Sequence, residues 1–247
     1  MDYIHAPNLP QSKVSLTAVG RAYQSILAAL NRMDIHCIAL SACNTLAAPV
    51  QFHADMLIHH LGGDAIVVNT AQAPEISELE GLGFTIAALN RPLGATYPFD
   101  CTLNAARIGN RLICGKATSP EILRHCNDNE IRPIFCPQGY AKCSVCIISE
   151  NALITADPSI AALCRDEGID VLEIRAGHIH LEGYPYGFIG GCSGMLAQGL
   201  IAFTGILETH PDAQRMIDFM NKHDVKHICL TENVLTDIGG ILPLACN

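Results

Sequence analysis

The chain has 247 residues, of which 49% are hydrophobic and 16% are charged. This composition excludes an intrinsically disordered protein, and the lack of an apolar run of about 18 residues excludes a transmembrane helix. The formal net charge is −9 and no cluster of Lys or Arg is present. We therefore expect neither nucleic acid nor an anionic membrane as a partner.

Twelve cysteines are spread along the chain. This density lies below that of small disulfide scaffolds, and residues 1–5 have neither the basic nor the apolar region of a signal peptide. We therefore expect a reducing, cytoplasmic compartment. Most of the thiols lie in apolar runs, which predicts that they pack as small hydrophobic groups.

Five segments of the chain each read as a helix followed by a strand. Helical periodicity over residues 14–33 leads into an apolar run at residues 35–40. The other four helices begin with a proline, which the first helical turn accepts without losing a hydrogen bond. Their starts and the apolar runs that follow are Ala73–Ile76 with Phe84–Leu89, Ser119–Leu123 with Arg132–Cys136, Asp157–Ile160 with Ile169–Ile174, and His210–Ala213 with Lys226–Leu230.

A second element recurs after each of these strands. Its copies begin at Asp55, Asp100, Lys142, Gly191 and Asp237, at steps of 45, 42, 49 and 46 residues. Four copies lead through a short turn into another apolar strand, at Asp64–Val68, Asn110–Cys114, Asn151–Thr155 and Gly199–Phe203. The last copy ends before such a strand, so another part of the chain must complete the first or last unit.

Five units of this kind predict one closed array. A single unit cannot bury both faces of its sheet, so the units must pack on one another, and radial sheets with helices outside do so without long exposed edges. A doubly wound parallel sheet also alternates helix and strand, but no strand is followed by a Gly-rich phosphate turn. We predict one α/β domain over residues 1–247, a five-fold pseudo-symmetric α/β propeller with its site on the axis.

Two regions resemble the pentein superfamily of guanidino-group-modifying enzymes. Residues 177–181 and 191–205 look like the dimethylarginine dimethylaminohydrolase stretch in which a catalytic His-Leu precedes a Cys-Ser and a strand. Residues 54–58 look like the family's Pro-Asp run, which supplies a substrate-binding carboxylate. The resemblance implies a five-bladed propeller in which a Cys attacks a guanidinium carbon, a His moves protons and carboxylates pair with the cation. It assigns His180 as the acid/base and Asp55 as a cation anchor.

The chain departs from the family pattern at the nucleophile. The family's Cys follows a Gly-rich turn in the last blade, where this chain has Pro243 or Leu244. Cys246 can take the position of the nucleophile only if the strand register shifts by two residues, because alternate strand positions share a face. Blade order puts Gln138 at the His position, and His59–His60 replaces the acidic pair after the family's Pro-Asp.

Further candidates line the predicted axis. Asp100 opens an element equivalent to that of Asp55, so a closed array places both near one end of the axis. Lys142 and Cys192, in the third and fourth copies, complete the candidate substrate-binding set together with Tyr186. Tyr186 belongs to a loop rich in Gly and aromatic residues, which can wall a small apolar or cationic ligand.

Two groups have partial metal-site spacing. His178 and His180 share one face of a strand-like run, but two histidines alone do not complete a site. Cys143 and Cys146 have the spacing of a metal knuckle, yet residues 142–148 read as a strand, which turns the two sulfurs to opposite faces. We expect no metal and no cofactor.

The sequence thus supports three functions. The first is a hydrolase or amidinotransferase that acts on the guanidino or amidine carbon of a small arginine-like molecule, with His180 and Cys246 as catalytic residues. The second is a small-molecule binding protein on the same fold that has lost its nucleophile. The third is a metal- or thiol-dependent enzyme that uses the two histidines and Cys192 or Cys143. Each predicts a small-molecule partner, and a homo-oligomer is compatible with all three.

Overall fold

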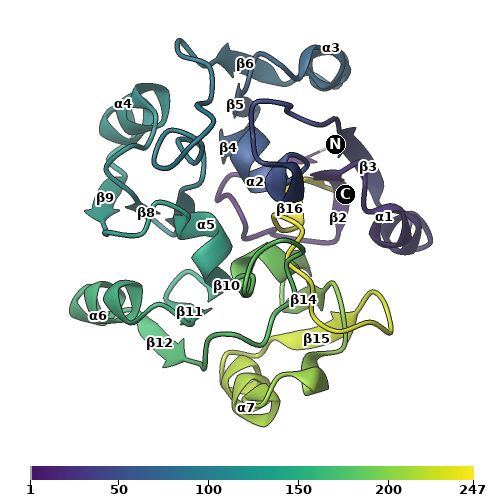
Figure 1. The fold of residues 1–247 in the computed structure, drawn as a ribbon, viewed down its shortest axis with the longest axis vertical. Helices are drawn as coiled ribbons and strands as arrows, with labels where there is room; N and C mark the ends of the chain where they lie inside the picture. Colours follow the sequence, from purple (N-terminus) through teal and green to yellow (C-terminus); the bar gives the residue numbers. More distant parts are fainter. Residues whose placement is uncertain (1) are drawn as a thin grey trace.

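The structure, a computed structural model that describes residues 2–247, is a ring of five small sheets around a central axis (Figure 1). Four sheets have three strands each, in chain order. They comprise β4 (Ile58–Gly62), β5 (Ala65–Val68) and β6 (Thr85–Ala88); β7 (Ala106–Ile108), β8 (Arg111–Cys114) and β9 (Arg132–Phe135); β10 (Val145–Ser149), β11 (Ala152–Thr155) and β12 (Asp170–Glu173); and β13 (Ser193–Ala197), β14 (Leu200–Phe203) and β15 (Lys226–Cys229). The predicted five-fold α/β propeller is confirmed.

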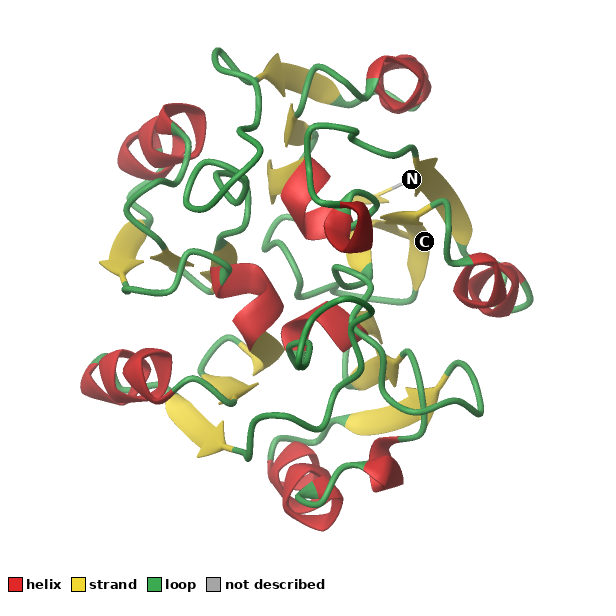
Figure 2. Ribbon diagram, in the orientation of Figure 1, coloured by secondary structure: helices red, strands yellow, loops and turns green. Residues whose placement is uncertain are grey.

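Each unit combines an antiparallel hairpin with a parallel third strand. The first two strands pair antiparallel, and the third pairs parallel to the second. A parallel neighbour requires a crossover connection, and a helix supplies it in every unit. These helices lie on the rim of the ring (Figures 1 and 2): α1 (Gln24–Asn31), α3 (Ala73–Gly81), α4 (Pro120–Asp128), α6 (Pro158–Asp166) and α7 (Ala213–Lys222).

The fifth sheet joins the two ends of the chain. Its order is β1 (Asp2–Tyr3), β16 (Leu242–Cys246), β2 (Val14–Gly20) and β3 (His36–Leu40). β2 therefore supplies the strand that the last copy of the repeat lacks. The predicted helix over residues 14–33 is wrong in its first half, because β2 is held between β16 and β3 and nearly all of its residues are buried. Long-range pairing overrides the local helical periodicity here.

Short turns carry the second recurring element to the axis. They include α2 (Ala54–Leu57), α5 (Ala141–Ser144) and η2 (Gly190–Cys192), and α2 and α5 lie near the centre of the ring in Figure 1. Two further 3-10 turns are η1 (Ala48–Val50) and η3 (Leu207–Thr209). The predicted strand over residues 142–148 is wrong at its start, because a helical turn precedes β10. That turn decides where Cys143 points.

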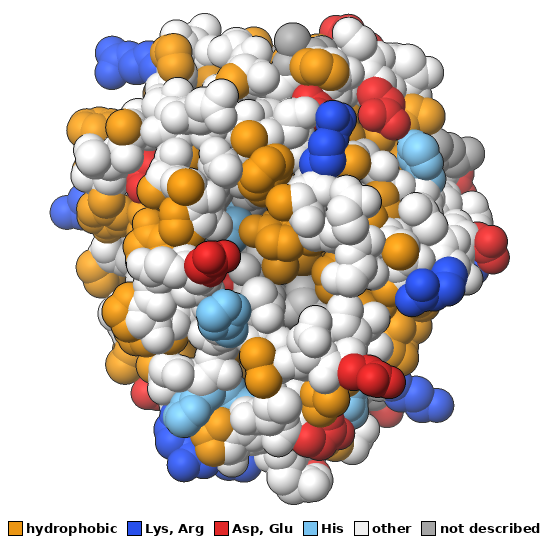
Figure 3. All heavy atoms as spheres, turned by 45° about the vertical axis from the view of Figure 1, so that its right-hand side comes forward, with side chains coloured by type: hydrophobic (Ala, Val, Ile, Leu, Met, Phe, Trp, Pro, Cys, Tyr) orange, Lys and Arg blue, Asp and Glu red, His pale blue; other side chains and the backbone are white. Residues whose placement is uncertain are grey.

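The interior is apolar and rich in thiols. All twelve cysteines are free, and ten of them are buried, as expected from their apolar surroundings. None of the helices within residues 2–247 has the length and apolar character to cross a lipid bilayer. On the face drawn in Figure 3, hydrophobic side chains gather around a hollow near the middle, and Lys and Arg side chains stand apart from one another. That face presents no concentrated positive charge.

The residue that caps the start of α6 is expected to contribute to the stability of the protein. The Asp157 carboxylate accepts hydrogen bonds from the backbone N–H groups of Ser159 (2.9 Å) and Ile160 (3.0 Å). Asp157→Ala leaves both donors without this acceptor and is expected to lower the free energy of unfolding by about 1 kcal/mol. Asp157→Asn can still accept these hydrogen bonds, so it should retain most of the stabilisation. Urea denaturation measures both variants. Asp166→Ala, at the exposed far end of α6, is the matched control, and an equal loss there would contradict the capping role.

Candidate functional site

A cavity of about 250 Å³ lies beside the axial turns α2 and α5. Its polar floor is formed by His53, Cys143 and Asp237. The walls are mostly aromatic and come from Tyr140 and from the loop between β12 and η2, with Tyr184, Tyr186 and Phe188. Val50, Met56, Leu181 and Pro185 complete the lining. The cavity thus combines one thiol, one imidazole and one carboxylate with an apolar enclosure, which is typical of small-molecule sites.

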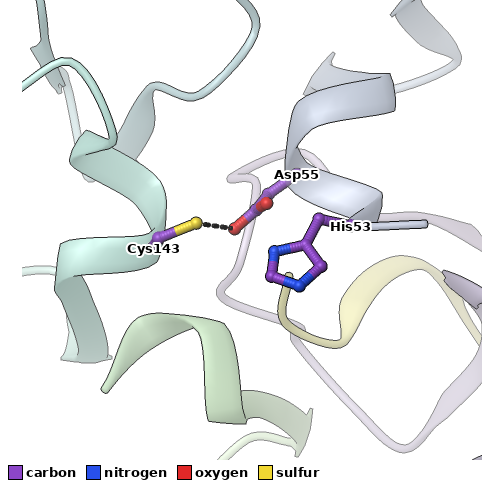
Figure 4. A group of neighbouring side chains, drawn as sticks. All are labelled: His53, Asp55 and Cys143. Carbon is purple, nitrogen blue, oxygen red and sulfur yellow. Dashed lines mark hydrogen bonds between the residues drawn. The ribbon is translucent and has the colours of Figure 1, made fainter. Parts of the chain in front are cut away.

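Cys143 and Asp55 form a direct contact across the axis. The Cys143 Sγ donates a hydrogen bond to Oδ2 of Asp55 at 3.0 Å, and both side chains are buried. Figure 4 shows the thiol and the carboxylate pointing toward one another from two different turns, with the His53 ring beside them. Ligand atoms of the three side chains all lie within 4.8 Å of one another. A nucleophile, a carboxylate and an imidazole therefore converge, and the thiol and the imidazole also line the floor of the cavity.

Asn104 fixes the two turns that carry this contact. Its side-chain oxygen accepts hydrogen bonds from the backbone N–H groups of Lys142 (2.8 Å) and Cys143 (3.1 Å). Its amide nitrogen donates to the backbone oxygen of Asp55 (3.3 Å) and to the Cys143 sulfur (3.2 Å). Because Asn104 is fully buried, these bonds form without competition from solvent and hold the thiol in place.

His53 is paired with a second buried carboxylate. Its Nδ1 lies 3.7 Å from Oδ1 of Asp237, and both side chains are almost inaccessible to solvent. Asp237 itself accepts backbone hydrogen bonds from Phe188 (2.9 Å) and Gly239 (3.0 Å). A Cβ at Gly191 would overlap this carboxylate, so only glycine allows Asp237 its place. The imidazole therefore lies between Asp237 and the cluster that it forms with Asp55 and Cys143.

Burial sets the protonation states of the cluster. It raises the pKa of Asp55 to about 7, against the opposing charge of Lys142. It raises the pKa of the Cys143 thiol well above its usual range, and the charges of Asp55 and Asp237 add to this effect. It lowers the pKa of His53, which Asp237 partly offsets. Near neutral pH the resting site therefore holds a neutral thiol, a neutral imidazole and a carboxyl group poised to exchange a proton.

Two polar atoms of the cluster are without hydrogen-bond partners in the described part of the chain. They are Nε2 of His53 and Oδ1 of Asp55, and both are buried. Buried polar atoms in proteins nearly always have partners, so two unpaired polar atoms beside a cavity indicate a place where a ligand binds.

Lys142 lies on the other side of Asp55 from the cavity. It is buried, and its Nζ donates to the backbone oxygen of Gly190 at 3.1 Å. With Asp55 it lines a small axial hollow of about 20 Å³. Lys142 was predicted to bind substrate, and the structure places its ammonium group where it compensates the charge of Asp55 instead of facing the cavity.

The other candidates occupy separate places. Asp100 accepts a hydrogen bond from the Tyr140 hydroxyl at 2.7 Å and so supports one wall of the cavity. Cys192 is buried, and its Sγ donates to the backbone oxygen of Ile189 at 3.3 Å. Tyr186 lies on the cavity wall, within the aromatic loop singled out from the sequence.

His180 and Cys246 are not brought together. His180 is exposed, and its backbone pairs with the segment that leads to Asp237. Cys246 is buried in β16, and its Sγ donates to the backbone oxygen of Ser12 at 3.6 Å. Neither lines the cavity. The structure keeps the two residues apart because β16 turns Cys246 into the core of the fifth sheet.

Sequence reasoning did not select His53 and Asp237, and it considered Cys143 only as an alternative. A signal for Asp237 was present, because it opens the fifth copy of the element that Asp55 and Asp100 open in the first two copies. Cys143 stands directly after the opening residue of its copy, as Cys101 and Cys192 do in theirs. No local pattern distinguishes these three thiols.

Comparison with known proteins agrees with this architecture. The model of a family of unknown function (DUF6873) matches residues 18–242, and none of the curated proteins matches the chain. Among solved structures, the chain is similar to a cysteine-to-serine mutant of DDAH from Pseudomonas aeruginosa complexed with citrulline, at 9% identity and a TM-score of 0.59, over 93% of this chain and 96% of that one.

Two other solved structures are similar over nearly their whole length. An inosamine-phosphate amidinotransferase from Streptomyces griseus is 10% identical with a TM-score of 0.61, over 99% of this chain and 96% of that one. An agmatine deiminase from C. jejuni is 8% identical with a TM-score of 0.56, over 93% and 90%. These proteins belong to the pentein superfamily, so the pentein fold expected from the repeats is confirmed. At such low identity the similarity establishes the fold alone.

Proposed function

The chain belongs to this family of unknown function (DUF6873), and we propose that it is a thiol-dependent enzyme acting on the amidine or guanidine carbon of a small cationic molecule. The observation that carries the proposal is the 3.0 Å hydrogen bond from Cys143, on the floor of the cavity, to the buried Asp55 behind it. Cys143 is the nucleophile in this proposal and takes the place first considered for Cys246. The solved structures of the same fold include a hydrolase, an amidinotransferase and a deiminase by name, which supports this class of reaction.

A bound cation supplies what the resting site lacks. The buried thiol is protonated, and a planar amidinium or guanidinium beside Asp55 and Asp237 adds the positive charge that lowers a thiol pKa. Asp55 then accepts the thiol proton, and the sulfur forms a bond to the central carbon. The hydrogen-bond donors of the cation face Asp237 on the cavity floor and the unpaired Oδ1 of Asp55, so the two carboxylates orient the substrate while Asp55 also activates the thiol.

The second half of the reaction requires a proton at the leaving nitrogen. Its C–N bond breaks as the nitrogen takes up the proton that Asp55 received, directly or through the His53 imidazole. An amidino group from a guanidine, or an imidoyl group from an amidine, remains on sulfur. Water or an amine then attacks the same carbon, loses a proton to the carboxylate or imidazole, and releases the thiol. Water makes the protein a hydrolase, and an amine makes it an amidinotransferase.

Alkylation by 2-chloroacetamidine tests this proposal. The reagent joins an amidinium to a thiol-reactive carbon, so it should modify Cys143 at least about 100-fold faster than the neutral 2-chloroacetamide does. Mass spectrometry locates the modified residue. Cys192 is an internal control, because it is equally buried on the axis without a carboxylate partner. Equal rates for the two reagents, or modification of another cysteine in place of Cys143, would contradict the proposal.

One observation favours a second function. The raised pKa of Cys143 suits a binding protein in which the thiol serves only as a hydrogen-bond donor to Asp55. Such a protein holds the same cation without forming a bond to it. Bound acetamidine should then protect Cys143 from a neutral thiol reagent, and 2-chloroacetamidine should modify Cys143 no faster than 2-chloroacetamide does.

We also propose a cytoplasmic location for the protein. Twelve free thiols, ten of them buried, support a reducing compartment. A disulfide found in protein isolated with its thiols blocked at lysis would contradict this.

A further inference from the structure

We infer that the cavity accepts an amidinium or guanidinium cation with a short uncharged tail and rejects the same cation with a tail carboxylate. This inference rests on the proposed function, because it places the reactive carbon at Cys143. It concerns the remainder of the substrate, which must lie between the cluster and the aromatic rim.

The cavity volume limits the length of the tail. About 250 Å³ corresponds to roughly eight water-sized groups at about 30 Å³ each. The three non-hydrogen atoms of the amidinium take about three of these positions. A tail of about four or five atoms therefore fits before it reaches the rim formed by Tyr184 and Tyr186, residues that are 45% and 41% exposed.

The walls suit an apolar tail. The rings of Tyr140 and Phe188 are stacked, with 29° between their planes and centroids 6.4 Å apart. The Tyr186 ring stands perpendicular to Phe188 at 6.3 Å. Aromatic faces and edges of this kind bury alkyl and aryl groups, and the faces of the tyrosines also attract positive charge.

The charges around the cavity disfavour an anion. Within residues 2–247, none of the side chains that line it is an Arg or a Lys. The charged group on its floor is Asp237, and Asp55 and Asp100 lie directly behind Cys143 and Tyr140. The Lys142 ammonium group donates a hydrogen bond to the backbone oxygen of Gly190 on the axial side. A tail carboxylate would lose water next to like charges and gain no cation in return.

A matched pair of reagents tests the inference. N-butyl-2-chloroacetamidine and N-(3-carboxypropyl)-2-chloroacetamidine share the reactive group and differ at the end of the tail. We expect the butyl reagent to alkylate Cys143 at least about ten-fold faster. Equal rates, or a faster reaction of the carboxylate reagent, would overturn the inference and leave the thiol chemistry standing. Failure of both reagents to modify Cys143 would overturn the proposed function and this inference with it.

A substitution at the rim of the cavity provides a second test of the preference for an uncharged tail. Tyr186→Arg places a cation at the end of the tail and should reduce the rate ratio of the two reagents to near one or invert it. Tyr186→Gln removes the ring without adding charge and should keep the preference for the uncharged tail. Because the readout is a ratio of rates within one variant, a general loss of reactivity leaves it unchanged. A ratio that falls equally in both variants would contradict the electrostatic explanation.

Discussion

Replacing Asp55 by Asn is expected to slow the alkylation of Cys143 by 2-chloroacetamidine by at least about 100-fold. The substitution keeps the shape of the side chain but removes both the acceptor of the thiol proton and the negative charge that pairs with the amidinium. The Cys143 thiol, whose pKa burial already raises well above its usual range, then has no base in contact with it.

The same substitution should not unfold the protein. Burial raises the pKa of Asp55 to about 7, so the stability that this carboxyl contributes is full below its unfolded value of about 3.9 and is lost as pH rises through 7. Asn carries no charge, so above neutral pH we expect Asp55→Asn to match or exceed the parent protein in free energy of unfolding. Thermal or urea unfolding of the variant separates a loss of chemistry from a loss of fold.

Asp100→Asn is the matched control for Asp55→Asn. Asp100 is also buried and opens the equivalent element of the next unit, but its carboxylate accepts from Tyr140 and does not contact Cys143. We expect its effect on the alkylation rate to stay below about ten-fold. If Asp55→Asn retained the parent rate, or if both variants lost the same factor, Asp55 would not be the partner that activates the thiol.

Acid is expected to destabilise the fold through two neighbouring histidines on β4. His59 and His60 are buried, and burial lowers their pKa values to about 3 and about 4, with Arg107 and His125 adding to the effect. In the unfolded chain both titrate near 6.5. Below that pH the unfolded state binds protons that the folded state excludes, so stability is lost from about pH 6.5 downward.

The free energy of unfolding is expected to depend strongly on pH in this range. Each histidine contributes about 1.4 kcal/mol per pH unit between about pH 6 and pH 4.5, or about 2.7 kcal/mol for the pair. His53, whose pKa burial also lowers, acts in the same direction. Asp55 opposes them, because its raised pKa makes the folded state take up a proton as pH falls. The free energy of unfolding, measured by urea denaturation at several pH values, should therefore fall steeply across this range.

His60→Gln isolates one contribution to the slope. The His60 Nε2 lies 2.9 Å from the backbone oxygen of Gly63, and a Gln amide can donate to the same acceptor without titrating. We expect this variant to flatten the dependence by about 1.4 kcal/mol per pH unit. His5→Gln, at an exposed position, should leave the slope unchanged. A slope in His60→Gln equal to that of the parent would show that His60 is protonated in the folded state.

The repeat and most of its strands could be predicted from the sequence. The strands after the second recurring element were predicted within one residue of β5, β8, β11 and β14. They are short apolar runs bounded by Gly, Asp or Asn, and those turn residues act locally. The proline-started helices were readable for the same reason, since Pro120 and Pro158 each begin a helix directly after its capping residue.

The strand β2 could not be predicted from the sequence. Residues 14–20 carry a periodicity that suits a helix, and they become a strand only because β16 lies beside them from the other end of the chain. The partner is more than two hundred residues away in sequence, so no local window contains the information. The same closure buries Cys246 and removes it from the candidate site.

The sequence alone determined that five similar units close into a ring, because each unit has an apolar face that only a neighbour can bury. It also brought Asp55 and Asp100 to the axis through their equivalent positions. Tertiary structure decided which of these thiols lies beside a carboxylate and an imidazole. Cys101, Cys143 and Cys192 occupy the same position of the repeat, yet only Cys143 meets Asp55 and a ring nitrogen of His53 within 4.8 Å. The direction of a side chain on a four-residue turn depends on the packing of that turn, here on Asn104, and not on its local sequence.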